Sequence, residues 1–202
     1  MNNYDGTMWV NRHKNRNDIS AYLTHLTKPR RKMDEVDVLI KILKERKLLG
    51  SGRNGFIKGT EKAVCFQDAP VNGIGQNILH EENMRKEFGG KVRYKGVGLM
   101  LPKPYIFKQG GRPVIYEDKE IASKLFADVN WRVVTMNFND RENIVDWSHE
   151  REWRIKGDFE FDLSKVHVVL SGRHEYKKFI ENVPEEILQE ILGIVTLDAV
   201  IT

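Results

Sequence analysis

The feature that most limits the possible folds is the placement of helical segments before, between and after short β-strand segments. Residues 33–49 carry Val36, Leu39, Ile40 and Leu43 at helical spacing, with acidic residues at the start and basic residues at the end. Short runs rich in β-branched and aromatic residues recur along the rest of the chain. This order predicts an α+β domain with a mixed, mainly antiparallel sheet flanked by helices.

The same patterns place the other elements. Glycines and prolines mark the stops, and a loop is expected at 51–59. Further helices are expected at 74–88, 118–129, 174–183 and 184–192. Strands are expected at 62–66, 92–101, 112–117, 131–138, 150–155, 165–171 and 199–202.

Length and composition bound the class of protein. The 202 residues fit one domain over 1–202, with a flexible N-terminal segment at 1–19. Cys65 is the only cysteine, which excludes a disulfide framework and a thiolate zinc site, so no metal is expected. Without a long apolar run or a signal-like N-terminus, we expect a cytoplasmic protein that does not enter a membrane.

The charge balance permits a nucleic-acid partner without establishing one. The formal net charge is +4, and part of the excess lies in the basic cluster at 28–32. Such a run is most often a solvated loop and only sometimes contacts phosphate. Glycine-rich phosphate-binding motifs are missing, since the segment 96–101 lacks the third glycine of a dinucleotide fingerprint and no P-loop is present.

The stretch DWSHEREWRI, residues 146–155, concentrates ionisable side chains between two tryptophans. In a strand, Glu150, Glu152 and Arg154 would share one face, with the two carboxylates about 7 Å apart. Two such carboxylates are costly to place together unless they meet water or a ligand. The face is therefore either solvated, with Glu152 paired to a neighbouring arginine, or catalytic.

A second stretch, residues 21–29, holds Thr24, His25 and Thr27 among leucines just ahead of the amphipathic helix. In a strand, Thr24 would lie on one face, and His25 and Thr27 on the other. One interpretation is that Thr27 caps a turn and His25 is a satisfied core histidine. The other is that these residues belong to a binding site.

These stretches, together with AVCFQDAP and GRPVIYE, resemble the AbiGi-like family of bacterial abortive-infection proteins over about residues 20–160. That resemblance implies a small cytosolic protein of phage defence. More distantly, the Thr24–His25 strand followed by a helix is similar to the DarT-like ADP-ribosyltransferases. The Glu150-x-Glu152 pair likewise resembles the Glu-x-Glu of other ADP-ribosyltransferases, although no full signature of that fold is present.

The resemblance implies an ADP-ribosyltransferase-like fold and an NAD-dependent mono-ADP-ribosyltransferase in phage defence or a toxin–antitoxin system. Glu152 would stabilise the oxocarbenium-like centre that forms when NAD loses nicotinamide, and Glu150 would orient or deprotonate the acceptor. Glu152 is then expected to line a cleft shared with His25 and to contribute little to stability. The NAD-binding residues would be Thr24, His25, Thr27, Tyr116 and Arg154, with Arg132 as an alternative to Arg154 at the pyrophosphate.

Two other functions fit the same residues. The chain could be a non-catalytic antitoxin or interaction module, with the polar strand as its interface and a toxin or antitoxin as its partner. It could also be a metal-dependent nucleic-acid-processing enzyme that uses Asp146, Glu150 and Glu152. For the transferase, the acceptor is expected to be a nucleic acid or a protein.

Overall fold

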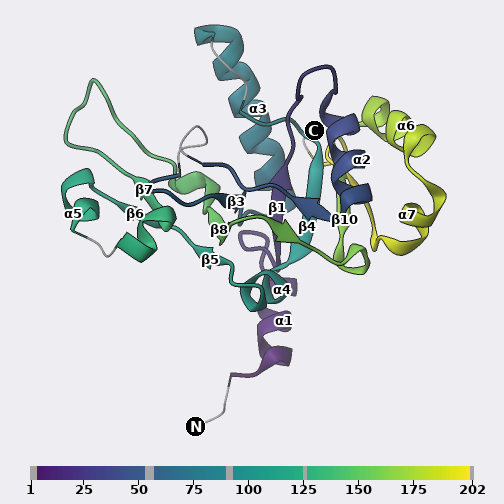
Figure 1. The fold of residues 1–202 in the computed structure, drawn as a ribbon, viewed down its shortest axis with the longest axis horizontal. Coiled ribbons are helices and arrows are strands. Elements are labelled where there is room, and N and C mark those ends of the chain that lie inside the picture. Colours follow the sequence, from purple (N-terminus) through teal and green to yellow (C-terminus); the bar gives the residue numbers. More distant parts are fainter. Residues whose placement is uncertain (1–3, 53–56, 90–92, 125–126, 201–202) are drawn as a thin grey trace.

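The computed structural model describes residues 4–52, 57–89, 93–124 and 127–200, and a four-stranded sheet lies at its centre (Figure 1). The strand order is β1 (Tyr22–Leu26), β4 (Gly98–Pro102), β10 (His167–Leu170) and β11 (Gly193–Thr196). The first two pairings are antiparallel and the last is parallel. A β-carbon at residue 98 would lie 2.1 Å from the carbonyl oxygen of His25, so the close approach of β1 and β4 requires glycine there.

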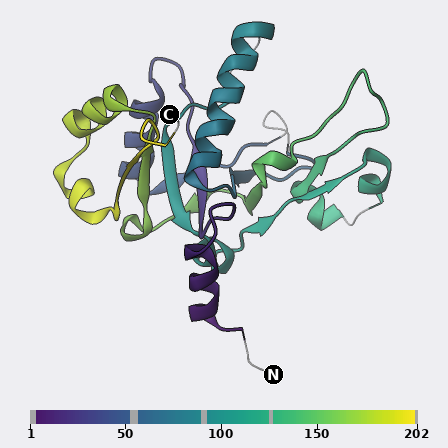
Figure 2. The same ribbon diagram turned by 180° about the vertical axis from the view of Figure 1, so that it is seen from behind.

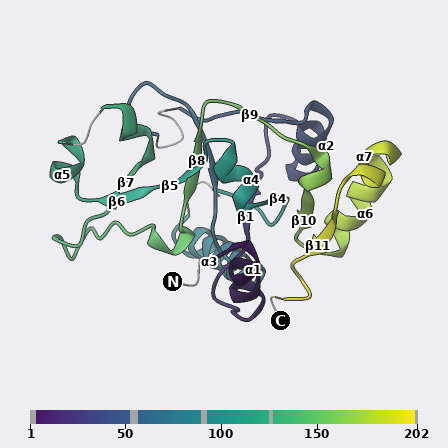
Figure 3. The ribbon, with the colours of Figure 1, turned by 90° about the horizontal axis from the view of Figure 1, so that it is seen from below.

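Helices cover both faces of this sheet (Figures 1 and 3). On one side lie α2 (Glu35–Glu45), α6 (Arg173–Asn182) and α7 (Glu185–Glu190), and on the other lies α3 (Val71–Phe88). Because side chains alternate along a strand, Leu99 and Leu101 of β4 pack into the core beneath α2. Met100 points the other way and packs with Ile74 and Ile78 of α3.

Helix α2 has a clear sequence signal at its start. The side chain of Asp34 accepts hydrogen bonds from the backbone N–H groups of Val36 and Asp37. The side chain of Asp37 in turn accepts the backbone N–H of Asp34, which completes a capping box. Arg46 adopts the left-handed conformation that ends the helix. The expected apolar face, Val36, Leu39, Ile40 and Leu43, is buried, which confirms the helix and its orientation.

A second sheet is formed by β3 (Ala63–Phe66), β8 (Trp153–Lys156) and β5 (Arg112–Pro113), with β8 in the middle and both pairings antiparallel. The two sheets meet where Thr24 and Gln67 exchange backbone hydrogen bonds of 2.9 and 2.8 Å. Two shorter pairs complete the β structure: β2 (Lys47–Leu48) with β9 (Phe159–Glu160), and β6 (Ile115–Glu117) with β7 (Val133–Thr135). The chain is therefore a single α+β domain with mixed, mostly antiparallel sheet structure, as expected from the sequence.

The remaining elements are short. Helix α1 (Gly6–Lys14) projects from the body and has no buried residue, so the segment expected to be flexible contains a helix (Figures 1 and 2). The others are α4 (Lys103–Lys108), α5 (Lys119–Ser123), and the 3-10 helices η2 (Ala127–Arg132), η3 (Ser148–Glu150) and η4 (Leu163–Lys165). No helix in the described part of the chain has the length and apolar character needed to cross a bilayer.

Several expected element bounds were wrong. The helix at 33–49 ends at Glu45, the strand at 92–101 begins at Gly98, and the strand at 131–138 spans only β7. The helix expected at 118–129 is divided into α5 and η2, and residues 125–126 lie outside the described residues. Residues 53–56, 92 and 201–202, which belong to other expected elements, also lie outside them. Of the strand expected at 199–202, residues 199 and 200 lie in a turn, and the last strand among the described residues is Gly193–Thr196, which pairs with β10.

Truncation of the α2 core should be costly. Leu39 has no exposed surface, so Leu39→Ala should lower the free energy of unfolding by about 2–5 kcal/mol. Lys44→Ala, on the exposed side of the same helix, should change it by less than about 0.5 kcal/mol. Urea unfolding of both variants tests this, and equal midpoints would contradict the packing of α2.

Candidate functional site

The stretch 146–155 does not form one continuous strand, contrary to the expectation for 150–155. Ser148–Glu150 is a 3-10 helix, and Arg151 follows it with φ 45° and ψ 49°. This left-handed residue reverses the chain before β8 begins at Trp153. Glu150 is thereby removed from the strand face that it was expected to share with Glu152 and Arg154.

Glu152 and Arg154 do face the same way and form a buried ion pair. The guanidinium donates from Nε to Oε1 at 2.7 Å and from Nη2 to Oε2 at 3.1 Å. Only 8% of Glu152 and 3% of Arg154 is exposed, so this face is not the solvated one that the sequence allowed. Arg154 also donates from Nη1 to the carbonyl oxygen of Trp131 at 2.6 Å.

Tyr116 and Cys65 adjoin this pair. The hydroxyl of Tyr116 accepts the backbone N–H of Glu152 at 2.9 Å, and burial raises the pKa of Tyr116 to about 12. Cys65 lies opposite Arg154 in the β3–β8 ladder. Burial, assisted by the charge of Glu152, raises the pKa of Cys65 far above its usual range, so its thiol is protonated and not a nucleophile.

Glu150 is a carboxyl group whose pKa burial moves toward neutrality. Burial raises the pKa of Glu150 to about 7, and repulsion by the Glu152 carboxylate acts in the same direction, while Arg93 opposes them. The backbone carbonyl of Glu150 accepts the N–H of Asp68 at 3.2 Å, which fixes this turn against the end of β3. Glu150 therefore exchanges a proton near neutral pH beside a second carboxylate.

A chain of polar side chains leads from Glu150 to α3. Burial raises the pKa of Tyr94, whose hydroxyl interacts with the side chains of Glu150 and Gln67. Gln67 is buried and accepts a hydrogen bond of 3.2 Å from Nδ2 of Asn77 on α3. Sequence reasoning missed Tyr94, Gln67 and Asn77, because isolated polar residues in otherwise ordinary segments carry no spacing signal. Together with Glu150, Glu152, Arg154 and Tyr116, we call these residues the carboxylate cluster.

His25 lies on the other side of β3 from the carboxylate cluster. Its Nδ1 is 2.8 Å from the carbonyl oxygen of Cys65, and its ring packs edge-on against Phe66 with centroids 5.8 Å apart. Cys65 and Phe66 are consecutive in the strand and point to opposite faces, so His25 and Glu152 do not share a cleft. Burial lowers the pKa of His25, which is consistent with a neutral ring that donates from Nδ1 to this carbonyl.

Thr27 and Arg132 have their partners outside the cluster, whereas Thr24 adjoins it through its backbone bonds with Gln67. Thr27 donates its hydroxyl to the carbonyl oxygen of Val97 at 2.9 Å and is buried. Thr24 is 1% exposed, and its hydroxyl has no hydrogen-bond partner among the described residues. Arg132 donates from Nε and Nη2 to the carbonyl oxygen of Pro113. Of the residues predicted from the sequence, the structure brings together Glu150, Glu152, Tyr116 and Arg154.

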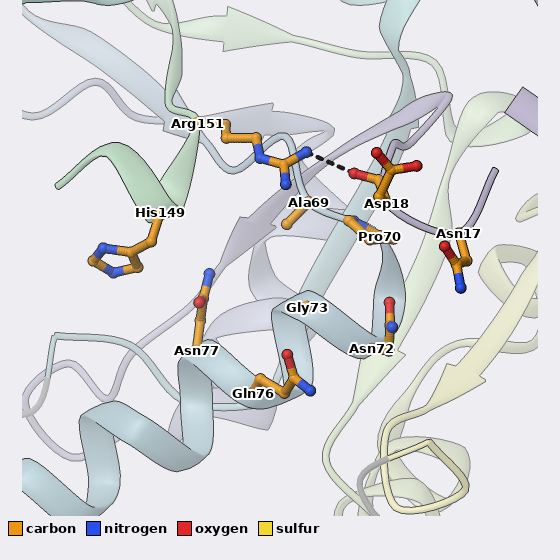
Figure 4. A pocket seen from close by; sticks show the side chains of 10 residues that line it. All are labelled: Asn17, Asp18, Ala69, Pro70, Asn72, Gly73, Gln76, Asn77, His149 and Arg151. Atoms are coloured by element: carbon orange, nitrogen blue, oxygen red, sulfur yellow. Dashed lines mark hydrogen bonds between the residues drawn. The ribbon is translucent and has the colours of Figure 1, made fainter.

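A pocket of about 360 Å³ lies next to the cluster (Figure 4). Neither Glu150 nor Glu152 lines it, although their chain neighbours His149 and Arg151 do. Arg151 donates from Nη1 to the backbone oxygen of Asp18 at 2.7 Å. This bond ties residues 15–21, the segment between α1 and β1 that we call the N-terminal arm, to the pocket rim. The lining residues are Asn17, Asp18, Ala69, Pro70, Asn72, Gly73, Gln76, Asn77, His149 and Arg151.

The described residues contain no group of three or more His, Cys, Asp or Glu side chains that could hold a metal ion. Asp146, the third acid considered for a metal-dependent enzyme, accepts the backbone N–H of Ser148 at 2.8 Å. Comparison of the chain with protein-family models, curated proteins and solved structures found no match.

Removal of the charge on Glu152 should destabilise the protein, in contrast to the expectation from the sequence. Glu152→Gln leaves the buried guanidinium of Arg154 without a counter-charge, which typically costs about 3–5 kcal/mol. Glu160→Gln is a matched control, because its carboxylate is 79% exposed and pairs with Lys47 at 3.5 Å. Chemical denaturation should show a large loss for Glu152→Gln and almost none for the control, and equal losses would contradict the burial of the pair.

Glu150 should make stability depend on pH in a defined direction. Its pKa is raised in the folded protein, so the native state holds a proton that the unfolded chain has released between the ordinary pKa of 4.5 and about 7. The stabilisation that this proton gives the folded state is present at low pH and is lost as pH rises through this window. The free energy of unfolding then falls by at most about 1.4 kcal/mol per pH unit.

Urea unfolding between about pH 5 and pH 8 tests this dependence. Glu150→Gln should lack the slope and become more stable relative to the wild type as pH rises. Glu186→Gln on α7, an exposed carboxylate, should retain the wild-type dependence. A constant difference between wild type and Glu150→Gln across the range would contradict the raised pKa.

Proposed function

We propose that the protein is an NAD-dependent mono-ADP-ribosyltransferase of bacterial phage defence or a toxin–antitoxin system, with an ADP-ribosyltransferase-like fold. The observation that carries the proposal is the pair of Glu150 and Glu152. The pKa of Glu150 is close to neutral pH, and the neighbouring carboxylate of Glu152 is oriented by a buried arginine. Transfer of ADP-ribose needs two such functions. One group stabilises positive charge at the ribose and another removes a proton from the acceptor.

Glu150 suits the second function. A general base works best when its pKa lies near the pH at which the enzyme acts, and burial raises the pKa of Glu150 to about 7. In the proposed reaction, Glu150 takes the proton from the acceptor nucleophile. The acceptor then bonds to the ribose carbon from which nicotinamide departs.

Glu152 suits the first function, stabilisation of the oxocarbenium-like centre. Arg154 and the hydroxyl of Tyr116 hold it from two sides, through its carboxylate and its backbone N–H. In this proposal Tyr116 and Arg154 position Glu152, which replaces the direct NAD contacts that the sequence suggested for them. His25, Thr24 and Thr27 support the strands around the site rather than bind NAD.

The alternative of a non-catalytic antitoxin or interaction module rested on an exposed polar strand. The burial of Glu152 and Arg154 removes that surface, which favours a chemical role for the stretch. The acceptor class we propose is a protein or a nucleic acid, in the cytoplasm of the cell.

NAD turnover tests the proposal. Wild-type protein, supplied with DNA, RNA or protein acceptors or with water alone, should release nicotinamide. Glu150→Gln should lower the rate by roughly 10²–10⁴ and remove the rise of the rate with pH near neutrality, without loss of melting temperature. Glu152→Gln should lower turnover by roughly 10²–10³ where it remains folded.

The exposed carboxylate variant Glu186→Gln serves as the matched control and should retain wild-type turnover. Two results would reject the transferase: no NAD consumption by the wild type with any acceptor, or equal rates for wild type and Glu150→Gln.

A further inference from the structure

The pocket beside the carboxylate cluster is lined by an unusual set of carboxamides. Asn72, Gln76 and Asn77 come from the first two turns of α3, and Asn17 comes from the N-terminal arm (Figure 4). Asn77 is engaged with Gln67, whereas the amides of the other three make no hydrogen bond to a described residue. The pocket therefore offers free donors and acceptors side by side.

One cation, Arg151, completes this set, and the carboxylate of Asp18 is close enough to interact with its charge. The guanidinium of Arg151 donates a single N–H to the backbone oxygen of Asp18 and forms no ion pair with any described carboxylate. The carboxylate of Asp18 is occupied by Arg16, which lies outside the lining. Partial burial lowers the pKa of His149, so this ring is neutral at pH 7. The remaining N–H groups of Arg151 can bind an oxyanion.

The size of the pocket sets the scale of its ligand. Its volume of about 360 Å³ is at the lower end of the range for small-molecule sites, about 300–1,000 Å³. Ala69, Pro70 and Gly73 contribute no long side chain, which leaves one wall open to a planar group. A simple anion would engage Arg151 alone, whereas a ligand that also carries a polar ring can replace water at the exposed amides.

We infer that this pocket, which shares only Asn77 with the carboxylate cluster, is a binding site for a nucleoside monophosphate, and this inference is independent of the transferase proposal. The phosphate pairs with the guanidinium of Arg151, which can bind two of its oxygens. The amides of Asn72 and Gln76 face the base, because a carboxamide matches the adjacent donor and acceptor that base edges carry.

Calorimetric titration with adenosine 5′-monophosphate tests the site, with adenosine and inorganic phosphate as the two partial ligands. The nucleotide should bind saturably with one site per chain and more tightly than either partial ligand. Arg151→Gly should weaken binding by about 10- to 100-fold, as expected for a lost charge-assisted hydrogen bond. Glycine also adopts the left-handed backbone of residue 151 without strain, so this variant keeps the turn.

Two α3 variants separate binding from folding. Gln76→Ala should weaken binding by about 3- to 10-fold. In Gly73→Ala the new methyl group would lie 3.5 Å from Ala69 and Pro70, both lining residues, and should weaken binding by roughly tenfold. Alanine favours a helix over glycine, so the melting temperature of Gly73→Ala should not fall. Gln189→Ala on α7 is an exposed amide control and should bind like the wild type.

Four results would overturn the inference. Saturable binding could be missing for the nucleotide, or inorganic phosphate could bind as tightly as the nucleotide. Adenosine could also match the nucleotide, which would exclude the phosphate contact. Finally, Arg151→Gly and Gln76→Ala could both retain wild-type affinity. None of these measurements involves NAD turnover, so the pocket and the transferase can fail separately.

Discussion

The buried pair between Arg154 and Glu152 is the interaction on which the surrounding structure depends. An ionised guanidinium is costly to remove from water unless its charge and its N–H groups are matched. Glu152 supplies the charge, and the carbonyl oxygen of Trp131 accepts a further N–H, so η2 is fixed against β8. Tyr116 then joins β6 to the backbone of Glu152. The charge retained by Glu152 also helps to keep a proton on Glu150.

The parts of the fold that could be predicted are those in which a local signal agrees with the tertiary contacts. Helix α2 has a capping box and an apolar stripe, and the packing uses both. The last strand shows the opposite case, because residues 193–196 and 199–202 are both rich in β-branched side chains. Only pairing with β10 selects the first of them, and that contact is long-range.

Only part of the site could be predicted from the sequence, for a similar reason. The i, i+2 spacing of Glu152 and Arg154 correctly placed them on one face, but nothing indicated that the face would be buried. Glu150 was misplaced because Arg151 adopts a left-handed conformation that an arginine rarely takes, so the period of two failed at that residue. The pocket gave no signal, since its walls come from segments near residues 17, 70 and 150 that only the fold brings together.

The position of β8 between β3 and β5 has a consequence for how this protein can diverge. The segment that carries Glu150, Arg151 and Glu152 leads into a middle strand, bonded on both edges, so its backbone cannot shift without disturbing both neighbours. The opposite wall of the pocket is built from the start of α3 and from an arm that leads back to the projecting α1. We therefore expect changes of length on the arm and substitutions at the exposed positions Asn72 and Gln76 of α3. A lineage can then alter what the pocket accepts while Glu150, Glu152 and Arg154 stay where they are.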